Sequence, residues 1–207
     1  MIPIEKLPSV IKDFATLHIL AGAIALTRTA KHCQQAAIES LREKFVLRNK
    51  WSEKSVKITV ATTETMQSEV YVLDKYLAEQ EEGGTRPVKA GGTPIPIEIR
   101  AAAKIDEAKV IPQAYRATRL AKGAKAINKN RPFVATVNNT TGVWVRSSDK
   151  RLPIELLYVL SERPKKITPR PWFEQPVAEA YDKHLDPEFT RALDEQTTRL
   201  LAKYGAG

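Results

Sequence analysis

The chain has 207 residues, of which 43% are hydrophobic, and a formal net charge of +9. This apolar fraction is enough for a folded core and excludes wholesale disorder, and the length suits one domain with an elaboration, so we interpret residues 1–207 as a single domain. The only cysteine, Cys33, excludes an internal disulfide. No apolar run reaches the ~18 residues that a membrane span needs. The first residues lack the basic and apolar regions of a secretory signal, so we expect a soluble, non-exported protein.

Two kinds of hydrophobic periodicity follow each other in the first eighty residues. Apolar residues at spacings of three, four and seven predict one long helix over 16–45, in which Gly22 and several alanines would allow another element to approach closely. Period-two alternation then predicts strands over 52–63 and 68–73. A short helical turn is expected over 74–82, before Gly83-Gly84 ends it.

A basic segment over 83–132, bounded by Gly/Pro-rich loops, is the most distinctive part of the sequence. From Arg86 to Arg131 it holds eleven Lys or Arg and three acidic residues, a net +8 of the chain's +9. Like charges at this density repel one another unless a polyanion or an acidic surface lies nearby. We expect a helix over 112–126 with cations along one edge. The residues expected to face DNA or a channel are Arg116, Arg119, Lys122, Lys125, Lys129 and Arg131.

Regular structure returns in the last third of the chain. Strands are predicted over 133–137 and 142–146, joined as a hairpin, and a more apolar strand over 153–160. After a Pro-rich arm over 161–176, two helices are expected, one over 172–185 and one that opens with Asp186 as N-cap and Pro187 at its first position. The predicted fold class is α+β: a long N-terminal helix and C-terminal helices packed on one face of a mostly antiparallel sheet of about five strands, with the basic segment as an insert.

The sequence contains no recognisable catalytic constellation. The three histidines, His18, His32 and His184, have no metal-ligand partner at a useful spacing, and His32 and Cys33 would point about 100° apart on a helix. The Gly-Gly-Thr pairs lack the Gly-Lys-Ser/Thr ending of a phosphate-binding loop. We interpret a cluster of three acids as a solvated helix end: Glu79, Glu81 and Glu82. We therefore expect no enzyme activity, no metal and no cofactor.

Four segments carry a resemblance to a known family. The first is LDKYLAEQEEGGTRP at 73–87, and the others are GVWVR at 142–146, LPIELLYVL at 152–160 and PRPWFEQP at 169–176. Together with the long N-terminal helix and the basic middle, they are similar to the tail-completion, or minor tail protein Z-like, proteins of tailed bacteriophages. The layout covers most of the chain, whereas the specific text consists of two short motifs that total about thirty residues.

Membership of that family implies a virion component without enzymatic activity. It would complete the head-proximal end of the tail, form a sixfold ring and join the tail to the DNA-filled head. The implied partners are other copies of the chain, a tail terminator or tail-tube protein, head–tail connector proteins and, without sequence specificity, the DNA backbone. The implied location is the tail or neck of the virion, after assembly in the host cytoplasm. The residues that we expect at a subunit interface are Trp172, Phe173, Arg163 and Arg170.

Other interpretations are open at this point. The chain could be a sequence-indifferent basic nucleic-acid-binding module, although its basic segment offers only Tyr115 and Phe133 for base stacking. The basic segment could instead bind an acidic helix of a neighbouring subunit, or be a solvated loop that contacts neither. The acids of that helix are Glu179, Asp182, Asp186, Glu188, Asp194 and Glu195. Trp172 and Phe173 could equally be core residues, because aromatic side chains bury a large area in either place.

Overall fold

The computed structural model describes residues 7–87, 95–98, 109–110, 112–121, 131–148, 150–161 and 163–204. The chain divides into two compact units. The first, here the helical unit, comprises Met1–Phe45, Lys50–Glu82 and Arg170–Gly207, and the second, here the sheet unit, comprises Val46–Asn49 and Gly83–Pro169. The predicted insert over 83–132 thus belongs to the same unit as the strands that follow it. No helix in the described ranges is long and apolar enough to cross a membrane.

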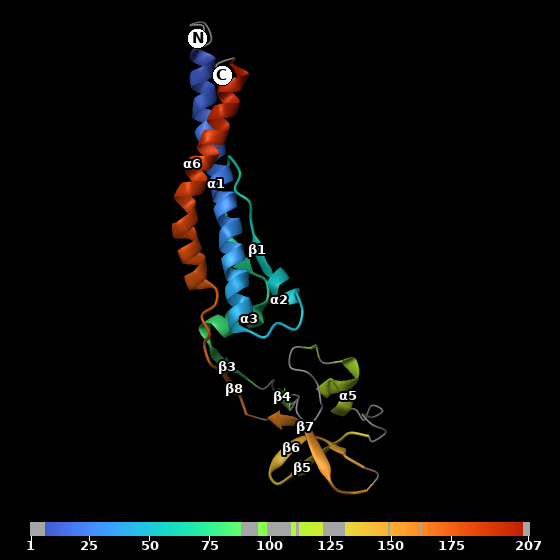
Figure 1. Ribbon diagram of the computed structural model, residues 1–207. Helices are drawn as coiled ribbons and strands as arrows, with labels where there is room; N and C mark the ends of the chain where they lie inside the picture. The colour runs from blue at the N-terminus through green and yellow to red at the C-terminus, as the bar shows by residue number, and fades with distance from the viewer. Residues whose placement is uncertain are drawn as a thin grey trace. The chain divides into compact units, whose positions relative to one another are not determined.

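Two long antiparallel helices, α1 (Leu7–Lys44) and α6 (Glu174–Lys203), lie side by side and form the body of the helical unit (Figure 1). At 1.5 Å per residue, the 38 residues of α1 extend about 57 Å. Ala21, Ala25 and Ala192 are buried where the helices meet, with Ile24 and Leu193 packed beside them. Small side chains at the contact let the two backbones approach closely, as the alanines of the predicted helix suggested.

Ion pairs fix the register of α1 against α6. Arg28 donates two hydrogen bonds to the carboxylate of Glu195, at 3.1 and 2.8 Å. Nearer the two chain ends, Lys203 and Asp13 form a pair at 2.6 Å. These pairs are partly exposed, so each contributes little to stability. Their value is that they specify which turn of α6 faces which turn of α1.

Helix boundaries differ from the prediction at two places. Helix α1 begins at Leu7 rather than at residue 16, and α6 runs continuously from Glu174 to Lys203 instead of forming two helices. Pro187 lies inside α6, where a proline removes one backbone N–H and clashes with the carbonyl four residues earlier. The helix changes direction partway along (Figure 1) but continues, and Oε1 of Glu188 beside the proline lies 3.2 Å from Nε2 of His32 in α1.

The remaining elements of the helical unit lie between α1 and α6 in sequence. They are α2 (Trp51–Lys54), β1 (Val56–Ile58), β2 (Val70–Val72) and α3 (Lys75–Glu82). Strands β1 and β2 pair antiparallel with Val56 opposite Val72. Val56 is fully buried, and its carbonyl accepts a hydrogen bond from the Gln34 side chain of α1 at 2.7 Å. This two-stranded ribbon therefore packs on α1.

The sheet unit contains six strands and two short helical segments in its described part. The elements are β3 (Gly84–Arg86), β4 (Ile95–Glu98), η2 (Gln113–Tyr115), α5 (Ala117–Ala121), β5 (Phe133–Val137), β6 (Thr140–Arg146), β7 (Ile154–Ser161) and β8 (Lys165–Ile167). Four strands form an antiparallel sheet in the order β4-β7-β6-β5, and β3 pairs separately with β8. Its core consists of Leu120, Val143, Val145, Leu157 and Tyr158. The predicted helix over 112–126 is replaced by η2 and α5 as far as residue 121.

The β5–β6 hairpin turns through Asn138 and Asn139, whose φ angles are 48° and 58°. Two central residues with positive φ are typical of the tight turn that matches strand twist, and asparagine tolerates that conformation well. The hairpin predicted from the sequence is therefore confirmed, with a shorter turn than expected. The turn aligns Phe133 with Trp144, whose indole N–H donates to the carbonyl of Ala135 at 3.0 Å.

The predicted α+β class is confirmed, with long terminal helices and antiparallel strand pairing. The strands are distributed over three separate sheets of two, two and four strands in the described part, where the prediction had one sheet of about five. Alternation along a sequence identifies a half-buried strand but does not name its partner. Strand β8 also lies inside the predicted Pro-rich arm, so the arm is paired with β3 there rather than free.

Candidate functional site

Charge is divided unequally between the two units. The sheet unit holds 18 Lys or Arg against 6 Asp or Glu, a net +12, whereas the helical unit holds 15 against 18, a net −3. The positive excess of the whole chain therefore lies in the sheet unit. Such a field attracts polyanions and acidic surfaces, and it repels another copy of the same unit.

Three of the six residues predicted to face DNA or a channel are on the described surface. Arg116, Arg119 and Arg131 are all exposed. Helix α5 is anchored by Leu120, which is 1% exposed in the core of the sheet unit, and this anchoring leaves the neighbouring Arg119 turned to solvent. The other three predicted residues lie outside the described residues: Lys122, Lys125 and Lys129.

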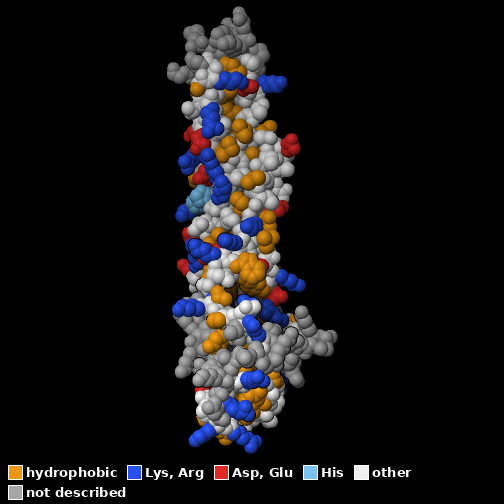
Figure 2. All heavy atoms as spheres, turned by 90° about the vertical axis from the view of Figure 1, so that its right-hand side faces the viewer, with side chains coloured by type: hydrophobic (Ala, Val, Ile, Leu, Met, Phe, Trp, Pro, Cys, Tyr) orange, Lys and Arg blue, Asp and Glu red, His pale blue; other side chains and the backbone are white. Residues whose placement is uncertain are grey.

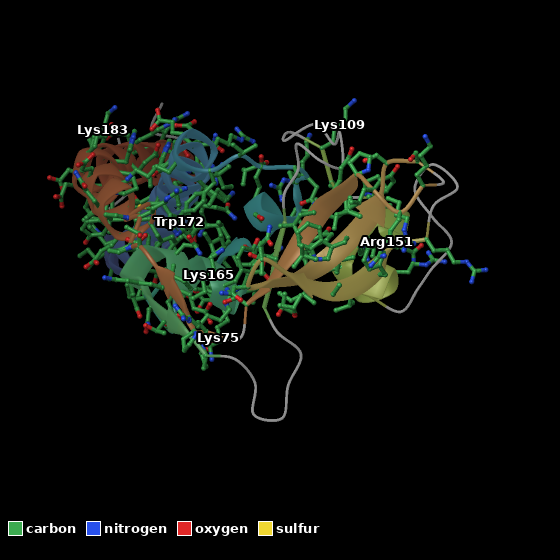
Figure 3. All side chains as sticks on the ribbon, turned by 90° about the horizontal axis from the view of Figure 1, so that it is seen from below. Lys75, Lys109, Arg151, Lys165, Trp172 and Lys183 are labelled. Atoms are coloured by element: carbon green, nitrogen blue, oxygen red, sulfur yellow. The ribbon has the colours of Figure 1, made fainter. Side chains whose placement is uncertain are left out.

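Further exposed cations of the sheet unit were not included in that prediction. They are Arg48, Arg86, Lys109, Arg146, Lys150, Arg151, Lys165 and Lys166, together with Arg163, which was predicted at a subunit interface. Lys109, Arg151 and Lys165 come from different segments of the unit, and Lys109 points away from the ribbon (Figure 3). Glu155 is the only carboxylate among the described side chains of this unit, and it accepts a hydrogen bond from Ser147. Figure 2 shows more blue than red side chains over the described part of the sheet unit.

A carboxylate of α3 caps the start of α6. Oε2 of Glu81 accepts the backbone N–H groups of Trp172 at 2.5 Å and Phe173 at 2.9 Å, and Oε1 accepts that of Glu174 at 3.2 Å. A helix leaves its first N–H groups without partners and carries partial positive charge there, so an anion is stabilising at this position. The interpretation of Glu81 as part of a solvated helix end is therefore wrong.

Trp172 is enclosed by its own unit. Its side chain is 1% exposed, and its indole N–H donates to the carbonyl of Leu77 in α3 at 3.2 Å. The ring meets Phe173 edge-on at 5.4 Å between centroids (Trp172 is labelled in Figure 3). This burial matches the core role that the sequence left open for Trp172, while Phe173 is half-buried and lines a groove.

Arg170 is held at the C-terminal end of α1. Its guanidinium lies 5.7 Å from the centre of the Phe45 ring and donates to the carbonyl of Lys44 at 3.5 Å, while its backbone N–H donates to Gln80. The ammonium of Lys44 in turn donates to the carbonyl of Pro171. Cations are favourable near the end of a helix, where the carbonyl groups lack partners. Arg170 thus contributes to its own unit in the same way as Trp172.

A pair of stacked histidines links the middle of α1 to α6. The rings of His32 and His184 lie 4.0 Å apart and within 8° of parallel, and Nε2 of His32 is 3.2 Å from Oε1 of Glu188. Burial lowers the pKa of His184, and the neighbouring His32 and Lys183 lower it further, against the opposing effect of Glu188. The pair borders an open groove of about 590 Å³ that also contains Glu39 and Glu179.

The described residues present charged and apolar surfaces. Among them, no three or more His, Cys, Asp or Glu side chains are grouped so as to hold a metal ion. Burial raises the pKa of the Cys33 thiol, which disfavours the reactive thiolate. Comparison with known proteins finds no matching family model, no matching curated protein and no matching solved structure.

Proposed function

We propose that this chain is a non-enzymatic structural subunit of a tailed-bacteriophage particle, located at the head-proximal end of the tail. In this role it completes the tail, joins it to the DNA-filled head and surrounds the path of the DNA together with other copies of itself. The observation that carries the proposal is the partition of charge, because one unit of the chain has a net charge of +12 and the other a net charge of −3. A subunit that lines a DNA conduit needs positive charge that is indifferent to sequence.

The four segments that carry the family resemblance are paired with one another, which supports the proposal. Glu81 in the first segment binds the backbone of Trp172 in the last. The segments 142–146 and 152–160 form most of β6 and β7, which are neighbours in the four-stranded sheet. The resemblance is thus concentrated in residues that hold each unit together, while most of the exposed cations of the sheet unit lie between these segments in sequence.

The long paired helices also suit a subunit that is built into an assembly. Large hydrophobic side chains remain exposed on the helical unit, among them Ile11 at 67%, Trp51 at 68% and Leu73 at 63%. Figure 2 shows hydrophobic side chains recurring along one face of this unit. Extended elements with exposed apolar side chains are expected where neighbouring subunits contact each other.

A sequence-indifferent nucleic-acid-binding module is the second candidate, and one observation limits how it would work. The guanidinium of Arg146 lies over the ring of Phe133 at 5.0 Å, so this face of Phe133 is covered. Base stacking on Phe133 is then disfavoured, and binding would depend on phosphate contacts alone. Both candidates predict weak, salt-sensitive DNA binding, so DNA binding by itself does not distinguish them.

Disruption of the gene in the phage genome that encodes the chain separates the two candidates. The proposal predicts that the lysate contains DNA-filled heads and separate tails, and that adding purified protein restores their joining. A point substitution that destabilises the protein, such as Trp172→Ala, is expected to restore joining less well in this rescue. If disruption leaves the yield of complete particles unchanged, the structural role is wrong and the binding module is favoured.

A further inference from the structure

An apolar groove in the helical unit has an acidic rim. The groove measures about 420 Å³ and lies between α1, β2 and the first turns of α6. Its wall includes Leu26, Val70, Phe173 and Val177, and the hydroxyl of Thr29 is buried there without a hydrogen-bond partner among the described residues. Apart from this hydroxyl the wall is largely apolar, and an exposed apolar surface of this kind is expected to contact another apolar group.

The rim residues come from the acidic first half of α6. Glu174 and Asp182 border the groove, and neither carboxylate forms an ion pair among the described residues. From Glu174 to Glu188, α6 holds five acidic residues and one lysine. Tyr181, which also lines the groove, is 46% exposed. A complementary occupant is therefore an apolar side chain flanked by cations.

The sheet unit presents such a segment in the β6–β7 loop. Leu152 is 66% exposed, and Lys150 and Arg151 beside it are also exposed, with no side-chain ion pair among the described residues. The backbone N–H of Ser147 donates to the carbonyl of Pro153 at 3.1 Å, which closes the base of the loop. The loop also contains Asp149, which lies outside the described residues.

We propose that the occupant of this groove is the segment 150–152 of a second copy of the chain, with Leu152 between the groove walls and Arg151 beside Asp182. The contact joins the basic unit of one copy to the acidic helix of the next, so it is head-to-tail, and head-to-tail contacts close into a ring when the rotation between copies permits it. The contact itself is inferred from the groove and the loop, and only the role of the ring in the tail rests on the proposed function. A loop in a groove is a weak contact by itself, because stable interfaces bury about 1,200–2,000 Å².

Cross-linking between singly labelled copies tests this contact. In a Cys33→Ser background, Leu152→Cys protein is mixed with Tyr181→Cys protein and treated with a short bis-maleimide. We expect heterodimers at a yield several-fold above that from the mixture of Leu152→Cys with Leu73→Cys, a control residue that is 63% exposed and does not line the groove. The yield is expected to fall several-fold between 50 and 500 mM salt, as it does for exposed charge pairs. If Cys33→Ser lowers the helical circular dichroism, Cys33→Ala provides the background.

A charge exchange tests the pairing that the proposal names. Adding Asp182→Lys to the Tyr181→Cys protein should reduce the cross-link yield. Mixing that protein with Leu152→Cys protein that also carries Arg151→Asp should restore the yield. Equal yields from the Tyr181→Cys and Leu73→Cys mixtures would overturn the proposal. It would also be overturned if a chain that carries both Leu152→Cys and Tyr181→Cys cross-links only within itself, at the mass of a monomer. If the cross-link fails while the chain is found in particles, the contact alone is wrong. If the cross-link forms while the chain is absent from particles, the proposed function alone is wrong.

Discussion

Glu81 lies near the end of the short helix α3, and we expect it to stabilise the helical unit more than an exposed carboxylate at the same helix end does. Its carboxylate accepts three backbone N–H groups at the start of α6, and those of Trp172 and Phe173 are partly buried. In Glu81→Ala these two donors lose their partner, and a partly buried unsatisfied donor costs about 1–3 kcal/mol. Loss of the favourable anion at the helix N-terminus adds about 0.3–1 kcal/mol. We expect the free energy of unfolding to fall by about 2–4 kcal/mol, the lower end of these ranges, because water reaches part of the site.

Urea unfolding followed by circular dichroism at 222 nm measures this loss, since α1 and α6 dominate the helical signal. Glu82→Ala is the matched control: it removes the adjacent carboxylate, which is exposed, and surface substitutions of this kind change stability by about 0.5 kcal/mol or less. Glu81→Gln keeps the acceptor oxygen without the charge and should fall between the two. If Glu81→Ala and Glu82→Ala unfold at the same urea concentration, the capping role of Glu81 is refuted.

Three further predictions concern the core, the pH dependence and the charge of the two units. Trp172→Ala should lower the free energy of unfolding by about 3–5 kcal/mol in the same urea assay, as truncation of a buried aromatic does, while Trp51→Ala at an exposed site should cost much less. Because the folded-state pKa of His184 lies below its ordinary value, the unfolded chain binds more protons than the folded chain near pH 6, so stability should decrease as the pH falls from 7.5 to 5. His184→Gln should make the free energy of unfolding less dependent on pH over this range. An unchanged dependence would contradict the prediction. Replacing Arg146 and Arg151 with Glu should leave the circular dichroism unchanged and weaken binding to duplex DNA, as measured by fluorescence anisotropy. The binding constant should also depend less steeply on salt concentration. Equal affinity would exclude these residues from the DNA contact.

Local patterns predicted the elements of this fold better than their partners. The periodicity of α1 and the Asn138-Asn139 turn were visible because a helix face and a tight turn depend on neighbouring residues. The pairing of β3 with β8 joins residues about eighty positions apart, and no local pattern encodes it. The same holds for Glu81, whose partners lie 91 to 93 residues away.

The sequence predicted part of the candidate site. The cations that it did not predict lie after residue 132 and contribute to the same excess of positive charge. The basic segment was bounded at residue 132, where strand periodicity resumes, yet cations continue at Arg146, Lys150 and Arg151 and again at Lys165 and Lys166. Their membership of one unit with the basic segment follows from tertiary contacts and not from spacing. A count of charge over 83–169 would have found the excess, but only the fold gives a reason to choose those limits.

The location of the chain in intact particles tests the central claim most directly. A short peptide tag at the C-terminus, labelled with nanogold and imaged by electron cryo-microscopy, reports that location in phage particles with and without packaged DNA. The account predicts label at the junction of head and tail, in several copies around the axis, and none along the tail or at its tip. Particles that assemble completely and carry no label, or that carry it only at the distal end, would contradict the account.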